Sequence, residues 1–411
     1  MYETEHIEER VILVGIDTGS TELAERSLDE LAELAKTAGA KVEGKLLQGR
    51  ESAHPGTYIG KGKLLELKDL LWETEATGII CDDELTSAQL GNLEAELCCK
   101  VIDRTLLILD IFAARAVTGE GKIQVELAQL RYRASRLTGL GRSLSRLGGG
   151  IGTRGPGEKK LEMDRRLIRE RISRLKRELR DVEKHRELIR AQRKQSGLKT
   201  AALVGYTSAG KSSIENALTD AGILEDAMLF STLDTTTRSL MLDNTQEILL
   251  TDTVGFIRKL PHHLVEAFKS TLEEAKYADI IIHVVDASNP QMDEQMYVVY
   301  DTLRQLGVED CPVITLFNKQ DRLKEPVRQR DFQADYSIPS SVKTGQGLEE
   351  LKKALLEIIR RDQIYIERLY EFSDAGKIQL IRSKGQLLSE EYVPEGIAVK
   401  AYVPKDIYGR I

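Results

Sequence analysis

The fold of this 411-residue chain is indicated first by the stretch LVGYTSAGKSS, residues 203–213. A glycine-containing turn here follows the apolar run AALV at 201–204 and precedes a helical pattern that begins near Lys211. Residues 205–212 fit the spacing G-x-x-x-x-G-K-[ST], in which backbone N–H groups of the turn and the helix N-terminus hold phosphate oxygens. A strand before the turn and a helix after it are the context that a true P-loop requires. The stretch therefore predicts a nucleotide-binding domain.

The side chains of this loop have separate predicted roles. Lys211 is expected to be catalytic, because its ammonium group can neutralise charge on the β and γ phosphates. The Ser212 hydroxyl is expected to bind Mg²⁺. We expect nucleotide contacts from the whole loop: Gly205, Tyr206, Thr207, Ser208, Ala209, Gly210, Lys211, Ser212 and Ser213.

A second motif, ILLTDTVGF at 248–256, lies about forty residues further on. Asp252 ends an apolar strand and suits a Mg²⁺ partner, while the Gly255 N–H can approach the γ-phosphate because no side chain obstructs it. Thr253 and Val254 lie between them and are included in the predicted nucleotide contacts.

The segment FSTLDTTTRSL at 230–240 provides two threonines for the same site. Thr236 or Thr237 can reach Mg²⁺ and the γ-phosphate, and both remain candidates, together with Gly255, for a catalytic role.

The base is predicted from ITLFNKQD, residues 314–321. A carboxylate at Asp321 can accept hydrogen bonds from N1–H and the N2 amino group of guanine, whereas adenine has no donor at N1, so the motif favours GTP over ATP. Asn318 is expected to brace the loop and Lys319 to cover the base with its aliphatic stem. Further on, Ser341, Val342 and Lys343 are expected to contact the guanine oxygen.

Charge is distributed unevenly along the chain. The formal net charge is −7, but residues 131–180 hold sixteen Lys or Arg against five Asp or Glu, a balance of +11. A local excess of this size is typical of a segment that binds a polyanion, and its long amphipathic pattern predicts two antiparallel helices around the glycine-rich segment 147–158. The alternative, a solvated charged helix pair, would carry more balanced charges.

The remaining sequence predicts a multidomain α/β protein. Strand and helix patterns alternate from residue 11 to about 110, with the apolar run at 100–112 in a strand position. We therefore expect an N-terminal α/β domain at 1–110, a basic helical hairpin at 111–195, a GTP-binding domain with a mixed, mostly parallel sheet at 196–361, and a small α+β domain at 362–411. No run of about 18 uncharged apolar residues is present, so a cytoplasmic protein without a membrane span is expected.

In their order along the chain, several segments together resemble the HflX family of ribosome-associated GTPases. They are TYIGKGKLLEL (57–67), DDELTSAQLGNLE (82–94), VELAQLRY (125–132), GGGIGTRGPGE (148–158), TLDTTTR (232–238), DTVGFI (252–257) and NKQD (318–321). The resemblance implies a GTP hydrolase that binds the large ribosomal subunit and the 70S ribosome, and we expect the protein to be a monomer. It also implies that the tip of the hairpin reaches toward the peptidyl-transferase region, with rRNA contacts through residues 131–180, and that the protein splits stalled or idle ribosomes under stress.

Three departures from the family pattern bear on mechanism. Serine at 208 replaces an asparagine that helps hold K⁺ in related GTPases, so the sequence gives only weak support for K⁺. The chain reads SSIEN at 212–216 where the family usually has STLFN, and Thr235 replaces a proline. Phe256, by contrast, is consistent with the family pattern. Many other GTPases place a glutamine that orients water there, so the apolar side chain predicts slow hydrolysis that a partner completes.

Two other functions remain open from the sequence. One is an RNA-binding assembly or hibernation factor in which GTP only orders the switch segments. The other is an ATP-dependent RNA remodeller that uses the N-terminal domain, for which GKGK at 60–63 is the one hint.

Overall fold

The computed structural model describes residues 8–144, 156–219, 229–230, 235–243, 246–259, 269–308, 310–323, 325, 329–405 and 407–411. The chain forms two compact units. The first comprises residues 1–181, 228–230 and 259–268, and the second comprises 182–227, 231–258 and 269–411. Of the predicted glycine-rich segment 147–158, residues 147–155 lie outside the described residues.

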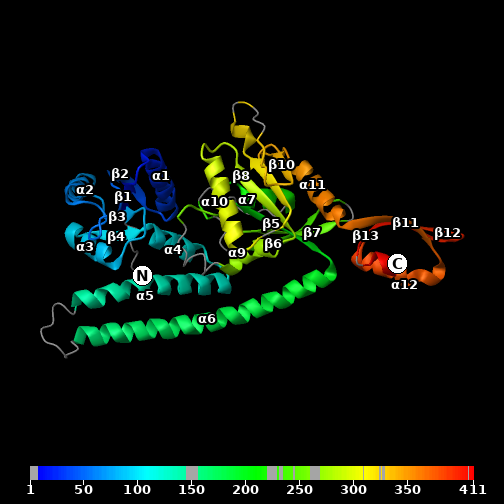
Figure 1. The fold of residues 1–411 in the computed structure, drawn as a ribbon, viewed down its shortest axis with the longest axis horizontal. Coiled ribbons are helices and arrows are strands. Elements are labelled where there is room, and N and C mark those ends of the chain that lie inside the picture. Colours follow the sequence, from blue (N-terminus) through cyan, green and yellow to red (C-terminus); the bar gives the residue numbers. More distant parts are fainter. Residues whose placement is uncertain are drawn as a thin grey trace, which may run out of the picture. The chain divides into compact units, whose positions relative to one another are not determined.

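The first unit contains a parallel four-stranded sheet, drawn in blue and cyan in Figure 1. Its strand order is β2-β1-β3-β4, from β1 (Arg10–Asp17), β2 (Lys41–Gly49), β3 (Gly78–Cys81) and β4 (Lys100–Asp103). The crossover helices are α1 (Thr21–Thr37), α2 (Lys61–Thr74) and α3 (Ser87–Leu97). These elements confirm the predicted βα layer.

One strand of this unit is much shorter than the sequence predicts. The apolar run at 100–112 forms a strand only as far as Asp103, and α4 (Arg104–Arg115) takes the rest. The Asp103 carboxylate accepts a hydrogen bond from the Leu106 N–H at 2.9 Å and so caps the helix. Ile108 and Ile111 on α4 are buried, which explains why the run is apolar on the helix as well.

A long antiparallel helix pair follows, formed by α5 (Gly119–Leu144) and α6 (Pro156–Ser196). Arg171 on α6 donates two hydrogen bonds of 2.7 Å to the Glu126 carboxylate on α5. The Arg165 guanidinium donates to the Leu137 carbonyl at 2.5 Å, closer to the hairpin tip. These contacts confirm the predicted hairpin, and the division between the two units falls within α6, after Asp181.

Two short segments from far along the chain also belong to the first unit. The Lys259 ammonium group donates to Asp82 at 2.5 Å and to Asp83 at 2.7 Å. The Phe230 ring packs edge-on against Phe112, with 4.7 Å between the ring centroids.

The second unit contains a six-stranded sheet of order β10-β9-β8-β5-β7-β6; among these described strands, only β6 is antiparallel to its neighbour. The strands are β5 (Lys199–Gly205), β6 (Thr236–Met241), β7 (Glu247–Asp252), β8 (Ile280–Asp286), β9 (Val313–Asn318) and β10 (Tyr336–Pro339). The helices that cover it are α7 (Lys211–Thr219), α9 (Lys269–Lys276), α10 (Met292–Gln305) and α11 (Leu348–Arg361). This mixed, mostly parallel sheet confirms the predicted P-loop fold.

Burial of the central strands fixes the position of the P-loop. Leu203, Leu250, Ile282 and Leu316 come from four neighbouring strands, and each has no measurable exposure. They share one core with apolar side chains of α7 and α11. Strands buried in this way read as continuous apolar runs, which is why the sequence shows them clearly.

The chain ends in a three-stranded antiparallel sheet of order β11-β13-β12, packed against α12 (Ala375–Lys384). The strands are β11 (Gln363–Tyr370), β12 (Gln386–Val393) and β13 (Gly396–Pro404). This confirms the predicted α+β C-terminal part, while the four-domain division of the chain stays a prediction. None of the helices in the described ranges combines the length and the apolar composition that crossing a membrane requires.

Candidate nucleotide-binding site

The sheet of the second unit brings the predicted motifs to one edge. Strands β5, β7 and β9 run parallel and end at Gly205, Asp252 and Asn318. Because the carboxyl ends of parallel strands lie at one edge of a sheet, the three motifs reach the same edge, with β5 beside β7 and β9 on the far side of β8. Ligands bind at this edge of open α/β sheets.

The P-loop turn depends on Gly210. Its φ is +99°, a conformation that residues with a Cβ rarely adopt, and a Cβ placed there would lie 2.4 Å from the Asn318 side-chain nitrogen. Ser208 also has a positive φ of +59°, and its side chain is exposed. The loop therefore turns tightly against the guanine-specificity motif.

The DTVG segment is joined to the P-loop through its backbone. The Thr207 N–H donates to the Phe256 carbonyl at 2.8 Å, and the Phe256 N–H donates to the Gly205 carbonyl at 3.1 Å. A Cβ on Gly255 would lie 2.9 Å from the Thr207 methyl carbon and 3.0 Å from the Lys211 nitrogen. Gly255 therefore sits directly on the phosphate loop, with no room for a side chain.

Lys211 is buried beneath the loop. Its ammonium group donates to the carbonyls of Gly205, at 3.3 Å, and Tyr206, at 3.0 Å. Burial lowers the pKa of Lys211 to about 8, and the nearby Asp252 carboxylate opposes this effect. A phosphate group beside this amine would favour its protonated, charged form further.

Ser212 and Asp252 form the core of the predicted magnesium site. The Ser212 hydroxyl donates to the Asp252 carboxylate at 2.8 Å, and Asp252 is only 1% exposed. Both groups offer oxygen atoms, which are the ligands that Mg²⁺ prefers. This pair fits a Mg²⁺ ion that it would hold together with phosphate oxygens.

The two candidate threonines point to opposite faces of β6. Thr236 lies in register with Asp252 on β7, and its hydroxyl contacts α7. The Thr237 hydroxyl instead lies 3.1 Å from the hydroxyl of Thr251. The Thr236 side chain thus lies on the face of β6 that is turned toward α7, the helix that carries Ser212, and the Thr237 side chain does not.

Thr253 and Val254, two of the predicted nucleotide contacts, have side chains that are buried in the protein. The Thr253 hydroxyl donates to the Leu203 carbonyl at 2.6 Å, so this buried side chain belongs to the sheet. Val254 is 5% exposed. Any nucleotide contact of these two residues would therefore have to come from their backbone groups.

Glu215 on α7 was not among the sequence-predicted site residues. Its side chain has no measurable exposure, and its carboxylate accepts from the Thr236 hydroxyl at 2.9 and 3.1 Å. Burial raises the pKa of Glu215 to about 7, although the Thr236 hydrogen bond lowers it in part. The sequence pointed to Glu215 only through the segment SSIEN, which places a carboxylate where the HflX family pattern has phenylalanine.

Asn318 and Lys319 connect three loops of the site. The Asn318 amide donates to the Ala209 carbonyl at 2.9 Å, and its oxygen accepts from the Val342 N–H at 3.4 Å. Lys319 donates to the Ser208 carbonyl and to Asp286, both at 2.7 Å. Asn318 therefore joins the P-loop to the loop after β10, and Lys319 lies across the P-loop.

Asp321 stands at the exposed end of this motif. The Ser341 hydroxyl donates to its carboxylate at 2.6 Å and holds the pKa of Asp321 below its ordinary value. Ser341 is fully buried, while Lys343 is exposed nearby. An ionised, positioned carboxylate is what recognition of two guanine donors requires.

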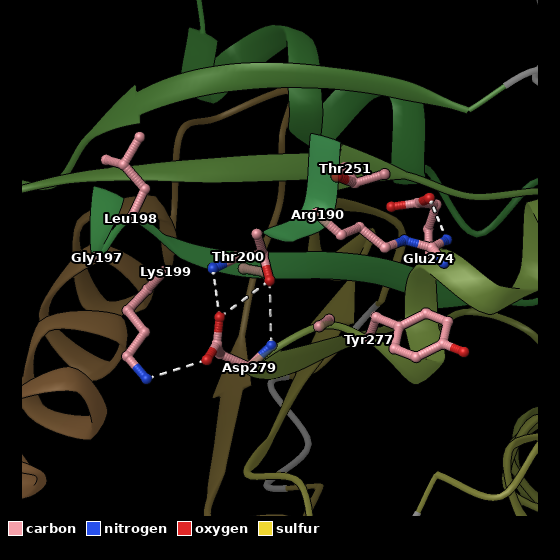
Figure 2. Close-up of a pocket in the computed structure, with 11 residues that line it drawn as sticks. Arg190, Gly197, Leu198, Lys199, Thr200, Thr251, Glu274, Tyr277 and Asp279 are labelled. Carbon is pink, nitrogen blue, oxygen red and sulfur yellow. Dashed lines mark hydrogen bonds and ion pairs between the residues drawn. The ribbon is translucent and has the colours of Figure 1, made fainter. Parts of the chain in front are cut away.

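A cavity of about 350 Å³ in the same unit is distinct from the predicted nucleotide site. Figure 2 shows that Lys199 and Thr200 contact Asp279 there, while Arg190 lies beside Glu274 and Tyr277. These residues surround the amino end of β5, whereas the P-loop follows its carboxyl end. The cavity is therefore not the phosphate site.

Comparison with known families agrees with the site. Residues 200–319 match the family model described as a 50S ribosome-binding GTPase. Residues 25–113 match the GTP-binding GTPase N-terminal family, and residues 115–193 match its middle region. The chain is 64% identical over 411 residues to a GTPase HflX of Lacrimispora saccharolytica, covering 100% of this chain and 97% of the relative.

The chain belongs to the HflX family. A GTPase HflX of Caldanaerobacter subterraneus is 48% identical to it, over 100% of this chain and 95% of the relative. A crystal structure of a GTP-binding protein from Sulfolobus solfataricus in complex with GDP is 25% identical, with a TM-score of 0.45, over 86% of this chain and 99% of that one. The family and the P-loop site together make this HflX chain a GTP hydrolase of a ribosome-binding GTPase family.

Proposed function

We propose that this HflX GTPase binds the large subunit of the ribosome and splits or rescues stalled or idle ribosomes under stress. The proposal depends chiefly on the basic hairpin attached to the GTP site. Exposed Arg169, Arg174 and Arg177 on α6 lie within the segment of +11 charge. Clustered exposed guanidinium groups suit the phosphates of rRNA.

Several parts of the proposal concern the nucleotide. Mg²⁺ is held by Ser212, Asp252 and Thr236, and it neutralises charge on the bound phosphates. Thr236 is preferred to Thr237 because its hydroxyl faces α7, which carries Ser212. K⁺ receives little support, because the Ser208 side chain is exposed and short.

Slow unaided hydrolysis is part of the proposal. Phe256 is 2% exposed, so its side chain packs inside the protein and cannot orient water at the phosphate. The ribosome then supplies the missing group or rearrangement. A cytoplasmic monomer fits this role.

Sucrose-gradient sedimentation of 70S ribosomes tests the function. Ribosomes are incubated with the protein and GTP, a non-hydrolysable GTP analogue, or GDP. We expect separated subunits with GTP and with the analogue, and intact 70S particles with GDP. Binding without separation in every arm would instead indicate the assembly or hibernation factor.

Two sets of variants sharpen this test. Replacing Arg169, Arg174 and Arg177 with glutamine should weaken ribosome binding. The slope of the logarithm of the binding constant against the logarithm of the salt concentration should become shallower by about 0.7 to 0.9 for each lost phosphate contact. The matched control replaces Lys400 and Lys405 of the C-terminal part with glutamine and should leave binding unchanged. Asp321→Asn should weaken GTP use and leave any ATP use untouched.

A further inference from the structure

Glu215 is a buried carboxylate directly beneath the strand that carries Thr236. It follows Ser212 by three residues on α7, so the two side chains lie on one face of the helix. Both of its oxygens lie within hydrogen-bond distance of the Thr236 hydroxyl, at 2.9 and 3.1 Å. A buried acid of this kind needs a partner, and Thr236 supplies one.

The surroundings of Glu215 place it next to the magnesium ligands. Thr236 pairs in register with Asp252 across β6 and β7, and Asp252 contacts Ser212 at 2.8 Å. Arg238, two residues after Thr236 on the same face of β6, has its guanidinium 3.7 Å from the Glu215 carboxylate. The Thr236 hydroxyl therefore lies beside the strand end that carries Asp252 and is held from below by Glu215.

The chemistry of a hydroxyl makes this arrangement useful. A threonine hydroxyl has one hydrogen and two lone pairs, so it can donate to one group while it binds a cation. Donation to Glu215 fixes the rotation of the O–H bond and leaves the lone pairs for the cation. Carboxylates that orient metal ligands in this way commonly change metal affinity by about 10- to 100-fold.

We propose that Glu215 is a positioning residue for Mg²⁺, acting through the Thr236 hydroxyl. The inference rests on the proposed assignment of Thr236 as a magnesium ligand. Phenylalanine, which the family pattern has at this position, cannot accept a hydrogen bond from Thr236. In this chain, β6 is therefore held to α7 by a hydrogen bond from Thr236 to Glu215 that the family pattern cannot form.

The experiment measures how Mg²⁺ slows the release of a fluorescent, non-hydrolysable GTP analogue from the full chain, by stopped flow. We expect Glu215→Phe and Glu215→Leu to raise the half-saturating Mg²⁺ concentration about tenfold or more. Glu215→Gln keeps one acceptor oxygen and should stay within about threefold of the parent. Thr236→Ala should raise the midpoint by itself, and adding Glu215→Phe to it should cause no further shift, because the two residues act as one unit.

A matched control separates positioning from stability. Asp331 is also a buried carboxylate that accepts two hydroxyls, from Tyr300 at 2.5 Å and Thr315 at 2.6 Å. Asp331→Ala should lower the thermal midpoint without moving the Mg²⁺ midpoint.

The outcomes test the role of Glu215 separately from the proposed assignment of Thr236 as a magnesium ligand. If Thr236→Ala shifts the Mg²⁺ midpoint and neither Glu215→Phe nor Glu215→Leu does, the role of Glu215 is overturned and the assignment of Thr236 stands. If none of the three shifts it, Thr236 is not the ligand and both statements fall. A shift in Asp331→Ala equal to that in Glu215→Phe would show a general effect of stability and would also overturn the inference.

Discussion

Replacement of Asn318 by alanine should weaken nucleotide binding, because Asn318 connects two loops of the site rather than contacting the base. Asn318 is 3% exposed and connects the P-loop, at the Ala209 carbonyl, to the loop after β10, at the Val342 N–H. Truncation removes both hydrogen bonds and leaves a buried carbonyl without its side-chain donor. It also opens space beside Gly210, which has a φ of +99° and packs directly against the Asn318 side chain.

The magnitude follows from these two contacts. Loss of the 2.9 Å bond to a buried carbonyl costs about 1 to 3 kcal/mol, and the longer 3.4 Å bond contributes less. A total of about 1 to 3 kcal/mol corresponds to a fall in nucleotide affinity of roughly 5- to 150-fold.

The assay is equilibrium titration of fluorescent GDP, combined with thermal unfolding in the absence of nucleotide. The matched control is Asn289→Ala, which removes one local turn contact to the Gln291 N–H and should change affinity less than about twofold. Affinity of Asn318→Ala within threefold of the parent would refute the bracing role of Asn318.

Three further predictions concern packing, acid stability and the cover of the P-loop. Gly255→Ala places a methyl group 2.9 Å from Thr207 and 3.0 Å from Lys211, so it should cost about 1 to 3 kcal/mol in urea unfolding; an unchanged midpoint would contradict the close approach. His283 is buried, which lowers its pKa to about 4, so the folded protein binds fewer protons than the unfolded chain between pH 6.5 and 4 and loses up to roughly 3 kcal/mol as pH falls through that window. His283→Phe should remove this part of the acid sensitivity in unfolding curves at pH 7 and pH 4.5, and equal pH slopes in parent and variant would contradict it. Lys319→Met removes the 2.7 Å contacts to Ser208 and Asp286 and should speed GDP release several-fold in stopped flow, whereas Lys352→Met, which removes an exposed helix pair with Glu349, should not.

The phosphate and base motifs were predictable because each combines a strand end with residues of narrow chemistry. Lys211, Asp252, Asn318 and Asp321 follow strands whose continuous apolar runs are unmistakable, and parallel strands bring such ends together without further information. The antiparallel helix pair was predictable from its apolar stripe in the same way.

Other features depended on three-dimensional context. The run at 100–112 is apolar enough for a strand or a helix, and the Asp103 cap that decides between them is a single local hydrogen bond. The choice between Thr236 and Thr237 depends on which face of β6 lies over α7, and adjacent strand residues always point to opposite faces. Glu215 gave no signal by itself, because a single acid in a helix is usually exposed.

The path of the chain through the first unit bears on how this protein can be dissected. Lys259 and Phe230 lie late in the sequence, on either side of the Thr236 and Asp252 segments, yet they contact Asp82, Asp83 and Phe112. A fragment cut within α6, at the division after Asp181, would therefore keep the P-loop and lose the partners of both residues. GTP turnover of such a fragment would be measured with Phe230 and Lys259 lacking these contacts, so rates for this enzyme are best measured on the full-length chain.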